Sequence, residues 1–310
     1  MTFEKIVVVT RKTRLAELVE RFNSRGQAKF YLEHAGGDFT DYEREDGAYR
    51  RSLEVLRRSL DVGLKMHFMD RELVPTCVFP PSDLIVTIGQ DGLVANAAKY
   101  VGEQPIVAVN PDPERFDGVL LRFRPEEARG AVEGVLGGKA PVREVTLGEA
   151  ALDDGQRLLA FNDFFIGART HVSARYRITF GERSEPQSSS GVLVSTGAGS
   201  TGWLSSVFNM AAGVGRFLGS GGMTRPTLEW EDPRLVFVVR EPYASRHSRA
   251  GLVAGILEPG RELVLESLMP SGGVIFSDGV EADTLAFNSG ARAVIRAAAR
   301  KARLVTGAAA

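Results

Sequence analysis

Three short runs of almost exclusively apolar, mostly β-branched residues constrain the fold of this chain most strongly. They cover residues 6–9, 84–88 and 106–109. Segments with helical spacing of apolar residues lie between them, such as 13–22 and 93–100. Strands buried on both faces read as continuous apolar runs, and their alternation with helices is typical of a parallel sheet covered on both sides. The sequence therefore predicts an α/β domain in the first part of the chain.

The pattern changes after the glycine-rich stretch 137–141. Beyond it, turn residues separate short β-like segments, at 158–161, 164–167, 175–180, 192–195, 235–239, 263–266 and 274–276. Short strands punctuated by turns are typical of a mainly β domain. We therefore expect two domains, an α/β domain over residues 1–140 and a β-rich domain over residues 141–310.

The sequence predicts the local structure of three further segments. Residues 184–190 contain Pro186 among serines and predict an exposed hairpin loop, and residues 213–222 predict a flexible loop. Residues 291–301 are rich in alanine and arginine, which favours a helix, although their place in the β-rich half favours a strand. Propensity alone predicts the helix.

Composition limits the classes of partner. The 310 residues carry 38 Lys and Arg against 39 Asp and Glu, so the chain lacks the basic field that general nucleic-acid binding requires. No apolar run is long enough for a membrane span or a secretory signal. The single cysteine, Cys77, excludes an intramolecular disulfide and a cysteine-based metal site. We expect a cytoplasmic protein with neither a nucleic-acid nor a membrane partner.

The motif Gly89-Gln90-Asp91-Gly92 follows the second apolar run and precedes a helical segment. Open α/β sheets bind their ligands at this place, beyond the carboxyl end of a strand. Glycines let the backbone approach a phosphate, and the following helix start offers free N–H groups. Asp91 is then a candidate general base for a hydroxyl. The alternative is an Asp-Gly turn that only closes a strand.

A second glycine-rich motif follows the apolar run at 192–194. Its glycines formally satisfy G-x-G-x-x-G, at Gly197, Gly199 and Gly202. A Rossmann site is disfavoured because the motif lies in the β-rich half and no acidic residue follows about 20 residues later. Such a turn can still bind polar ligand groups through its backbone and hydroxyls. The alternative is a helix start with Ser200 or Thr201 as the N-cap.

Taken in order, these segments resemble the NAD kinases, which use ATP to phosphorylate the 2′-hydroxyl of the adenosine ribose of NAD. The resemblance covers roughly residues 84–305. It is carried by five stretches, which are Ile88-Gly89-Gln90-Asp91-Gly92-Leu93, Val109-Asn110, Phe161-Asn162-Asp163-Phe164-Phe165, residues 190–203 and Phe276-Ser277-Asp278-Gly279.

The resemblance implies an α/β N-terminal domain, a C-terminal β-sandwich that binds the dinucleotide, Mg²⁺ with ATP, and homodimers or homotetramers. Asp91 would be the general base that accepts the proton of the 2′-hydroxyl. The phosphate or nucleotide loop would consist of Gly89, Gln90, Gly92 and Asn110. NAD would contact Asn162, Asp163, Ser195, Thr196, Gly199, Ser200, Thr201, Trp203 and Asp278.

The chain departs from the family pattern within these motifs. Gln90 stands where the second glycine of GGDGT is expected, and Leu93 stands where its threonine is expected. Asp163 replaces a glutamate, and Ser190 replaces the aspartate before Gly191. Two other functions therefore stay open: a noncatalytic nucleotide-binding protein of the same fold, and a kinase for another hydroxyl, on a sugar or a lipid.

Overall fold

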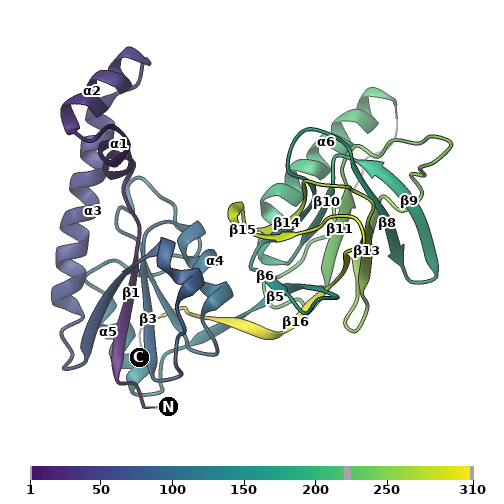
Figure 1. Cartoon of the computed structure of the whole chain (residues 1–310). Coiled ribbons are helices and arrows are strands. Elements are labelled where there is room, and N and C mark those ends of the chain that lie inside the picture. The colour runs from purple at the N-terminus through teal and green to yellow at the C-terminus, as the bar shows by residue number, and fades with distance from the viewer. Residues whose placement is uncertain (1, 220–224, 308–310) are drawn as a thin grey trace. The chain divides into compact units, whose positions relative to one another are not determined.

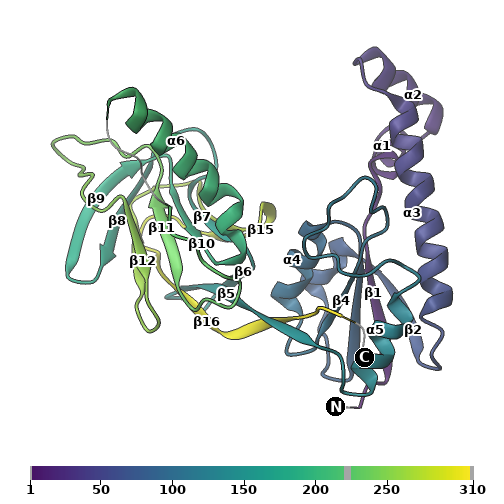
Figure 2. The ribbon, with the colours of Figure 1, turned by 180° about the vertical axis from the view of Figure 1, so that it is seen from behind.

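The computed structural model describes residues 2–219 and 225–307 of the chain (Figure 1; Figure 2 shows the view from behind). The chain divides into two compact units. The first unit runs through Arg143 and includes the segment from Arg303 on, and the second unit is Glu144–Ala302.

The last strand, β16 (Arg292–Val305), begins in the second unit and ends in the first. Near its end, Leu304 pairs with Ile106 in β4 (Ile106–Val109), and the two strands run parallel. A strand of 14 residues is long enough to serve both units. The expected assignment of all residues after 140 to the second domain is therefore wrong for the segment from Arg303 on.

The sheet of the first unit is parallel, with the order β2-β1-β3-β4. Its other strands are β1 (Lys5–Thr10), β2 (Lys65–Asp70) and β3 (Asp83–Ile88). The three apolar runs of the sequence are β1, β3 and β4, so the predicted parallel α/β sheet is confirmed. β2 lacks such a run because it lies at the edge of the sheet and exposes alternate side chains.

Helices of the first unit cover both faces of this sheet. The unit contains α1 (Arg14–Phe22), α2 (Arg25–His34), α3 (Phe39–Ser59), α4 (Asp91–Tyr100), α5 (Ala128–Leu136) and the short 3₁₀ helix η1 (Arg71–Thr76). Of these, α1 and α2 pack on each other and on α3. α3 and α5 pack on one face, where Leu56 and Val132 join strand residues in one buried core. α4 packs on β3 and β4 from the other face (Figures 1 and 2). This layering leaves the carboxyl ends of the strands for loops.

The second unit is a β-sandwich, as expected. One antiparallel sheet has the order β12-β11-β10-β7-β14-β15. Its strands are β7 (Asp163–Ala168), β10 (Val192–Ser195), β11 (Leu235–Val239), β12 (Ala254–Leu257), β14 (Gly273–Ser277) and β15 (Val280–Ala286). The facing strands are β5 (Val142–Leu152), β6 (Arg157–Ala160), β8 (Ala174–Phe180), β9 (Arg183–Ser189), β13 (Leu263–Ser267) and β16. Residues such as Phe164, Tyr176 and Phe237 fill the core between the two sheets.

The local prediction at 184–190 is wrong, and the conflict at 291–301 is resolved in favour of the strand. The expected loop at 184–190 is mostly strand β9, which pairs with β8 along its whole length. The segment 291–301, for which propensity predicts a helix, lies almost entirely in strand β16 and pairs with β13. In both cases the neighbouring strand supplies backbone partners and a buried face, which outweigh local propensity.

α6 (Trp203–Phe217) overlaps the expected flexible loop at 213–222. Residues 213–217 are helical, so the prediction is wrong there, and residues 220–222 lie outside the described part of the chain. The helix begins by packing Leu204 against the sheet of β10 and β11. Packing at this end lets the helix continue through its two glycines.

Candidate functional site

The Gly89–Gly92 motif forms the link between β3 and α4. Gly89 is buried, and its backbone N–H donates to the carbonyl oxygen of Val109 at 3.3 Å. A Cβ atom at Gly89 would lie 2.8 Å from Cδ2 of Leu93. Leu93 is 3% exposed, so the residue at the threonine position of the family motif packs inside the protein. Gln90 is the N-cap of α4, and its side chain makes no capping hydrogen bond and is exposed.

Asp91 is the first residue of α4. Its Oδ1 accepts a hydrogen bond from the backbone N–H of Leu120 at 2.8 Å. Within the described residues its Oδ2 has no hydrogen-bond partner. The carboxylate is therefore half held by a loop and half open, beside the first N–H groups of a helix, which have no carbonyl partner within that helix.

Asn110 follows β4 and is buried. Its Nδ2 donates to the carbonyl oxygen of Phe116 at 2.9 Å, and its Oδ1 accepts from the N–H of Asp112 at 3.0 Å. The side chain is thus committed to shaping the loop 110–123. Asn110, Asp91 and the Gly89–Gly92 turn all lie at the carboxyl edge of the parallel sheet, as the strand order requires.

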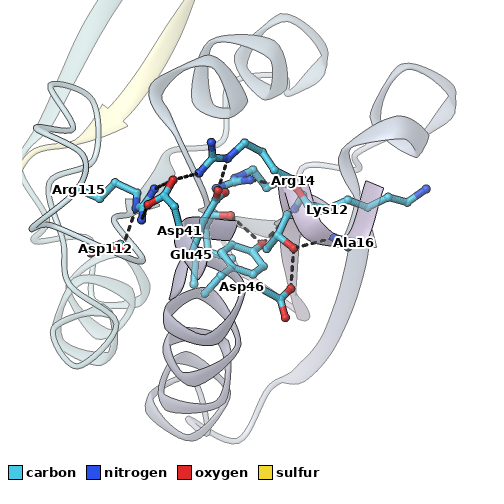
Figure 3. Close-up of polar contacts among 12 residues, drawn as sticks. Lys12, Arg14, Ala16, Asp41, Glu45, Asp46, Asp112 and Arg115 are labelled. Atoms are coloured by element: carbon cyan, nitrogen blue, oxygen red, sulfur yellow. Dashed lines mark hydrogen bonds and ion pairs between the residues drawn. The ribbon is translucent and has the colours of Figure 1, made fainter. Parts of the chain in front are cut away.

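A network of ion pairs lies at the same edge and was not found from the sequence (Figure 3). Glu45 is 3% exposed and pairs with Arg11 at 2.9 Å and with Arg14. Asp41 pairs with Arg14 at 2.9 Å and with Arg115 at 2.6 Å. Hydrogen bonds from Arg115 and from Arg14 hold the pKa of Asp41 far below its usual range. The many charged residues of the segment 41–60 predict a helix exposed to solvent, so the sequence pattern gave no sign that Glu45 is buried.

In the second unit, the Asp278 carboxylate holds the segment before β7. Oδ2 accepts from the N–H of Phe161 at 2.9 Å, and Oδ1 accepts from the N–H groups of Asn162 at 2.6 Å and Asp163 at 3.3 Å. Asp278 has a φ of +55° and precedes Gly279, with a φ of +70°, so these two residues form a turn. Asp278 thus orients the backbone of Asn162 and Asp163, which lie in the stretch 161–165 that resembles a motif of the NAD kinases.

Asp163 is 8% exposed at the first position of β7. Burial, together with the nearby negative charge of Asp278, raises the pKa of the Asp163 carboxyl group to about 7. A carboxyl group with such a pKa exchanges a proton near neutral pH. Asp163 can therefore either donate or accept a hydrogen bond when a ligand binds.

Replacing Asp163 with asparagine is expected to remove a pH dependence of stability. The pKa of Asp163 in the folded chain, about 7, lies above its ordinary value of 3.8, so the folded chain retains a proton that the unfolded chain releases. The free energy of unfolding of the wild type therefore falls as pH rises from about 4 to 7, by about 4 kcal/mol at most. Urea unfolding at pH 5 and pH 8 measures this fall. Equal falls in wild type and variant would contradict the prediction.

The turn after β10 is tied to the same segment. Oγ1 of Thr196 donates to the carbonyl oxygen of Phe161 at 2.6 Å, and its N–H donates to that of Asn162 at 2.9 Å. Oγ of Ser195 donates to the carbonyl oxygen of Thr196 at 3.1 Å, and Oγ of Ser200 donates to that of Gly197 at 2.7 Å. Ser195, Thr196 and Ser200 are buried, so their hydroxyls build the turn.

The glycines of this turn permit close packing of backbone on backbone. A Cβ atom at Gly199 would lie 2.1 Å from the carbonyl oxygen of Asn162, and one at Gly197 would lie 1.8 Å from that of Glu229. The turn forms the 3₁₀ helix η2 (Ala198–Thr201), and Gly202 is the N-cap of α6. The alternative prediction of Ser200 or Thr201 as the N-cap is therefore wrong.

Three predicted contact residues keep accessible side chains. Asn162 is half-buried and Thr201 is exposed, and neither side chain makes a hydrogen bond within the described part of the chain. Trp203 is half-buried and stacks on Phe165 with 5.8 Å between ring centroids. The guanidinium of Arg240 lies 5.2 Å from the centre of the Trp203 ring.

A cavity of about 660 Å³ in the second unit includes Trp203 in its wall. Phe165 and Phe276 line it too, and their rings stack at 5.0 Å. Arg169 and Arg240 supply positive charge, and these lining residues all belong to the second unit. An aromatic wall with basic side chains suits a ligand that has a planar ring and a phosphate.

Within the described ranges, no group of three or more His, Cys, Asp or Glu side chains could hold a metal ion. None of the described helices is long and apolar enough to cross a membrane.

Sequence comparison relates the chain to enzymes named NAD kinase, although no family model matches it. The chain is 32% identical over 126 residues to the NAD kinase of Cytophaga hutchinsonii, a match that covers 39% of this chain and 43% of that protein. It is 25% identical to the mitochondrial NAD kinase 2 of Rattus norvegicus, over 78% of this chain and 74% of that protein. The chain therefore spans less than half the length of the Cytophaga relative.

The fold is similar to that of solved kinase structures. An NAD kinase from Archaeoglobus fulgidus, in complex with ATP, has a TM-score of 0.58 over 97% of this chain and 93% of its own, with 17% identity. A yeast NADH kinase complexed with NADH has a TM-score of 0.58 over 99% of this chain and 84% of its own, with 16% identity. At these identities the likeness concerns the fold alone.

Proposed function

We propose that this chain, a divergent member of the NAD kinase family, transfers a phosphoryl group from ATP to the adenosine ribose 2′-hydroxyl of NAD and so forms NADP. The position of Asp91 carries the proposal. Asp91 follows a buried parallel strand, begins a helix, and has one carboxylate oxygen without a partner among the described residues. This arrangement suits a base that acts on a hydroxyl next to a phosphate.

In the proposed reaction, Oδ2 of Asp91 accepts the proton of the 2′-hydroxyl. The ribose oxygen attacks the γ-phosphorus of ATP, and the bond from that phosphorus to the bridging oxygen breaks, so ADP leaves with the electron pair. The N–H of Leu120 holds the other carboxylate oxygen at 2.8 Å and so directs Oδ2. The N-terminus of α4 and the backbone at Gly89 and Gly92 favour the phosphate charge.

For the acceptor, we propose that Asn162, Asp163, Thr201 and Trp203 contact NAD. The accessible side chains of Asn162 and Thr201 support this, as does the place of Trp203 in the wall of the cavity. The buried Ser195, Thr196, Gly199 and Ser200, together with the half-buried Asp278, shape the backbone that presents them. This division assigns contact with NAD to four of the motif residues and packing to the other five.

The metal of the proposed reaction is Mg²⁺ that arrives with ATP as part of the substrate. The described residues offer no cluster of ligands that could hold an ion by themselves. Mg²⁺ on the phosphates would neutralise charge during transfer. The chain itself would supply the proton acceptor and the groups that orient the substrates.

The cytoplasmic location expected from the sequence stays a prediction.

The proposal is tested by incubating purified protein with NAD, ATP and Mg²⁺ and detecting NADP by chromatography and mass spectrometry. NADP formation that requires all three supports the proposal. A thermal shift with NAD but no NADP would overturn it in favour of the nucleotide-binding alternative. A phosphorylated sugar or lipid in parallel incubations, with no NADP, would favour the other-hydroxyl kinase.

We also propose that the chain forms a homodimer or homotetramer. On α6, Phe217 is 88% exposed and Leu218, which follows the helix, is 70% exposed, while Met210 and Val214 are about half exposed. Exposed apolar patches of this kind mark interaction surfaces. Phe217→Glu is expected to convert the oligomer to single chains in sedimentation velocity. A wild type that sediments as a single chain at micromolar concentration would contradict this.

A further inference from the structure

The loop 110–123 supplies the one hydrogen bond that the Asp91 carboxylate accepts within the described part of the chain. Its donor is the N–H of Leu120, at 2.8 Å. The loop leaves β4 at Asn110 and returns at Phe123, whose N–H donates to the carbonyl oxygen of Ala108 at 3.2 Å. Between these ends the loop contains no helix or strand. A loop of this length stays in place only where side chains fasten it.

Arg115 fastens the outer part of this loop to α3. Its two terminal nitrogens donate to the two oxygens of Asp41, at 2.6 and 3.2 Å. Its Nε lies 3.6 Å from the carboxylate of Asp112 within the loop. Ser52 of α3 adds a second tie, because its Oγ donates to the carbonyl oxygen of Pro111 at 2.6 Å. The Arg115–Asp41 contact joins residues that are 74 positions apart in the sequence.

Asp41 is itself held by a continuous chain of charges (Figure 3). Arg14, at the start of α1, donates to Asp41 at 2.9 Å and also to the buried Glu45. Glu45 in turn accepts from Arg11 at 2.9 Å. An isolated exposed ion pair contributes little to stability. A bidentate arginine–carboxylate contact inside a network of charges, in contrast, can fix the positions of the segments that it joins.

We propose that Arg115 and Asp41 are positioning residues for Asp91, which act by holding the loop 110–123 so that Leu120 keeps the carboxylate oriented. The inference rests on the proposed function of Asp91 as the base. It assigns the charge network a role in the rate of phosphoryl transfer and none in the affinity for ATP or NAD. Small displacements of a reacting group, of about 1 Å, can lower a rate by up to a hundredfold.

Kinetics of Arg115→Gln and Asp41→Asn test this. Each change is expected to lower kcat about tenfold and to leave the KM values for ATP and NAD within about twofold of wild type. The double variant is expected to be no slower than either single variant, because each single change already breaks the same contact, the one between Arg115 and Asp41. Arg115→Lys keeps the charge and is expected to restore part of the rate. Unchanged kcat in both single variants would overturn the inference.

Arg129→Gln is the matched control. Arg129 pairs with Glu133 at 2.9 Å on the exposed surface of α5 in the same unit. Its loss removes an arginine and an ion pair without touching the loop 110–123, so wild-type kcat is expected. A tenfold loss in this variant too would assign the effect to general loss of charge and would overturn the positioning role.

Amide hydrogen exchange gives a readout that does not depend on activity. In Arg115→Gln, exchange at Leu120 is expected to become at least about tenfold faster, with the rest of the first unit unchanged. If the wild type forms no NADP, the proposed function fails while this result still supports the mechanical link. Unchanged exchange at Leu120, or faster exchange throughout the first unit, would overturn the link itself.

Discussion

Replacement of Asp91 by asparagine is expected to lower the rate of NADP formation about a thousandfold. General acid–base groups contribute about a hundredfold to ten-thousandfold, and an amide cannot accept the hydroxyl proton. Asparagine still offers an oxygen to the N–H of Leu120, so the loop and the fold are expected to persist. Initial rates measure the loss, and calorimetric titration with NAD and ATP is expected to show wild-type affinities.

Asp117→Asn provides the control for that change. Asp117 lies in the same loop, is exposed, and undergoes the same loss of charge. Its rate is expected to match the wild type. A wild-type rate for Asp91→Asn would contradict the role of Asp91 as the base. Loss of NAD and ATP binding together with the rate would show that Asp91 holds substrate.

Gly199→Ala is expected to destabilise the second unit by about 3 kcal/mol or more. The added Cβ atom would lie 2.1 Å from the carbonyl oxygen of Asn162 and 2.8 Å from Oγ of Ser195. The nearest of these atoms belongs to the backbone and cannot move aside as a flexible side chain can. Overpacking of this kind costs about 1–3 kcal/mol, and more where backbone must shift. Urea unfolding measures the loss, and the thermal shift with NAD is expected to disappear.

Gly213→Ala is the matched control for that prediction. Gly213 lies inside α6 of the same unit, and nothing stands within 4 Å of an added Cβ atom. The change is expected to raise stability by about 0.5–1 kcal/mol, because alanine favours helix. Wild-type stability of Gly199→Ala combined with lost NAD binding would contradict the packing role. That outcome would assign Gly199 to close approach of the ligand.

The departures at Gln90 and Leu93 affect different parts of the turn between β3 and α4. Leu93 is buried and packs beneath Gly89, so this position supports the loop from inside. Gln90 is exposed as the N-cap of α4, next to Asp91. The departure at Gln90 is therefore the one expected to change which phosphate donor the chain accepts.

Local sequence determined the elements that local chemistry specifies. The buried strands β1, β3 and β4 follow from apolar runs that cannot stay in water, and the turn at Asp278 and Gly279 follows from residues that tolerate a positive φ. The placement of Asp91 between a strand and a helix follows from the same pattern. These features depend on neighbours within about ten residues, so the sequence by itself contains their cause.

Tertiary structure decided the features that depend on distant partners. β16 is a strand although its alanines favour helix, because β13 pairs with it. The Asp278 carboxylate holds N–H groups more than 110 residues away, and Arg115 reaches Asp41 across 74 residues. The raised pKa of Asp163 arises only when folding buries it beside Asp278. Pairing and burial set the energies of these groups, and both exist only once the chain has brought the partners together.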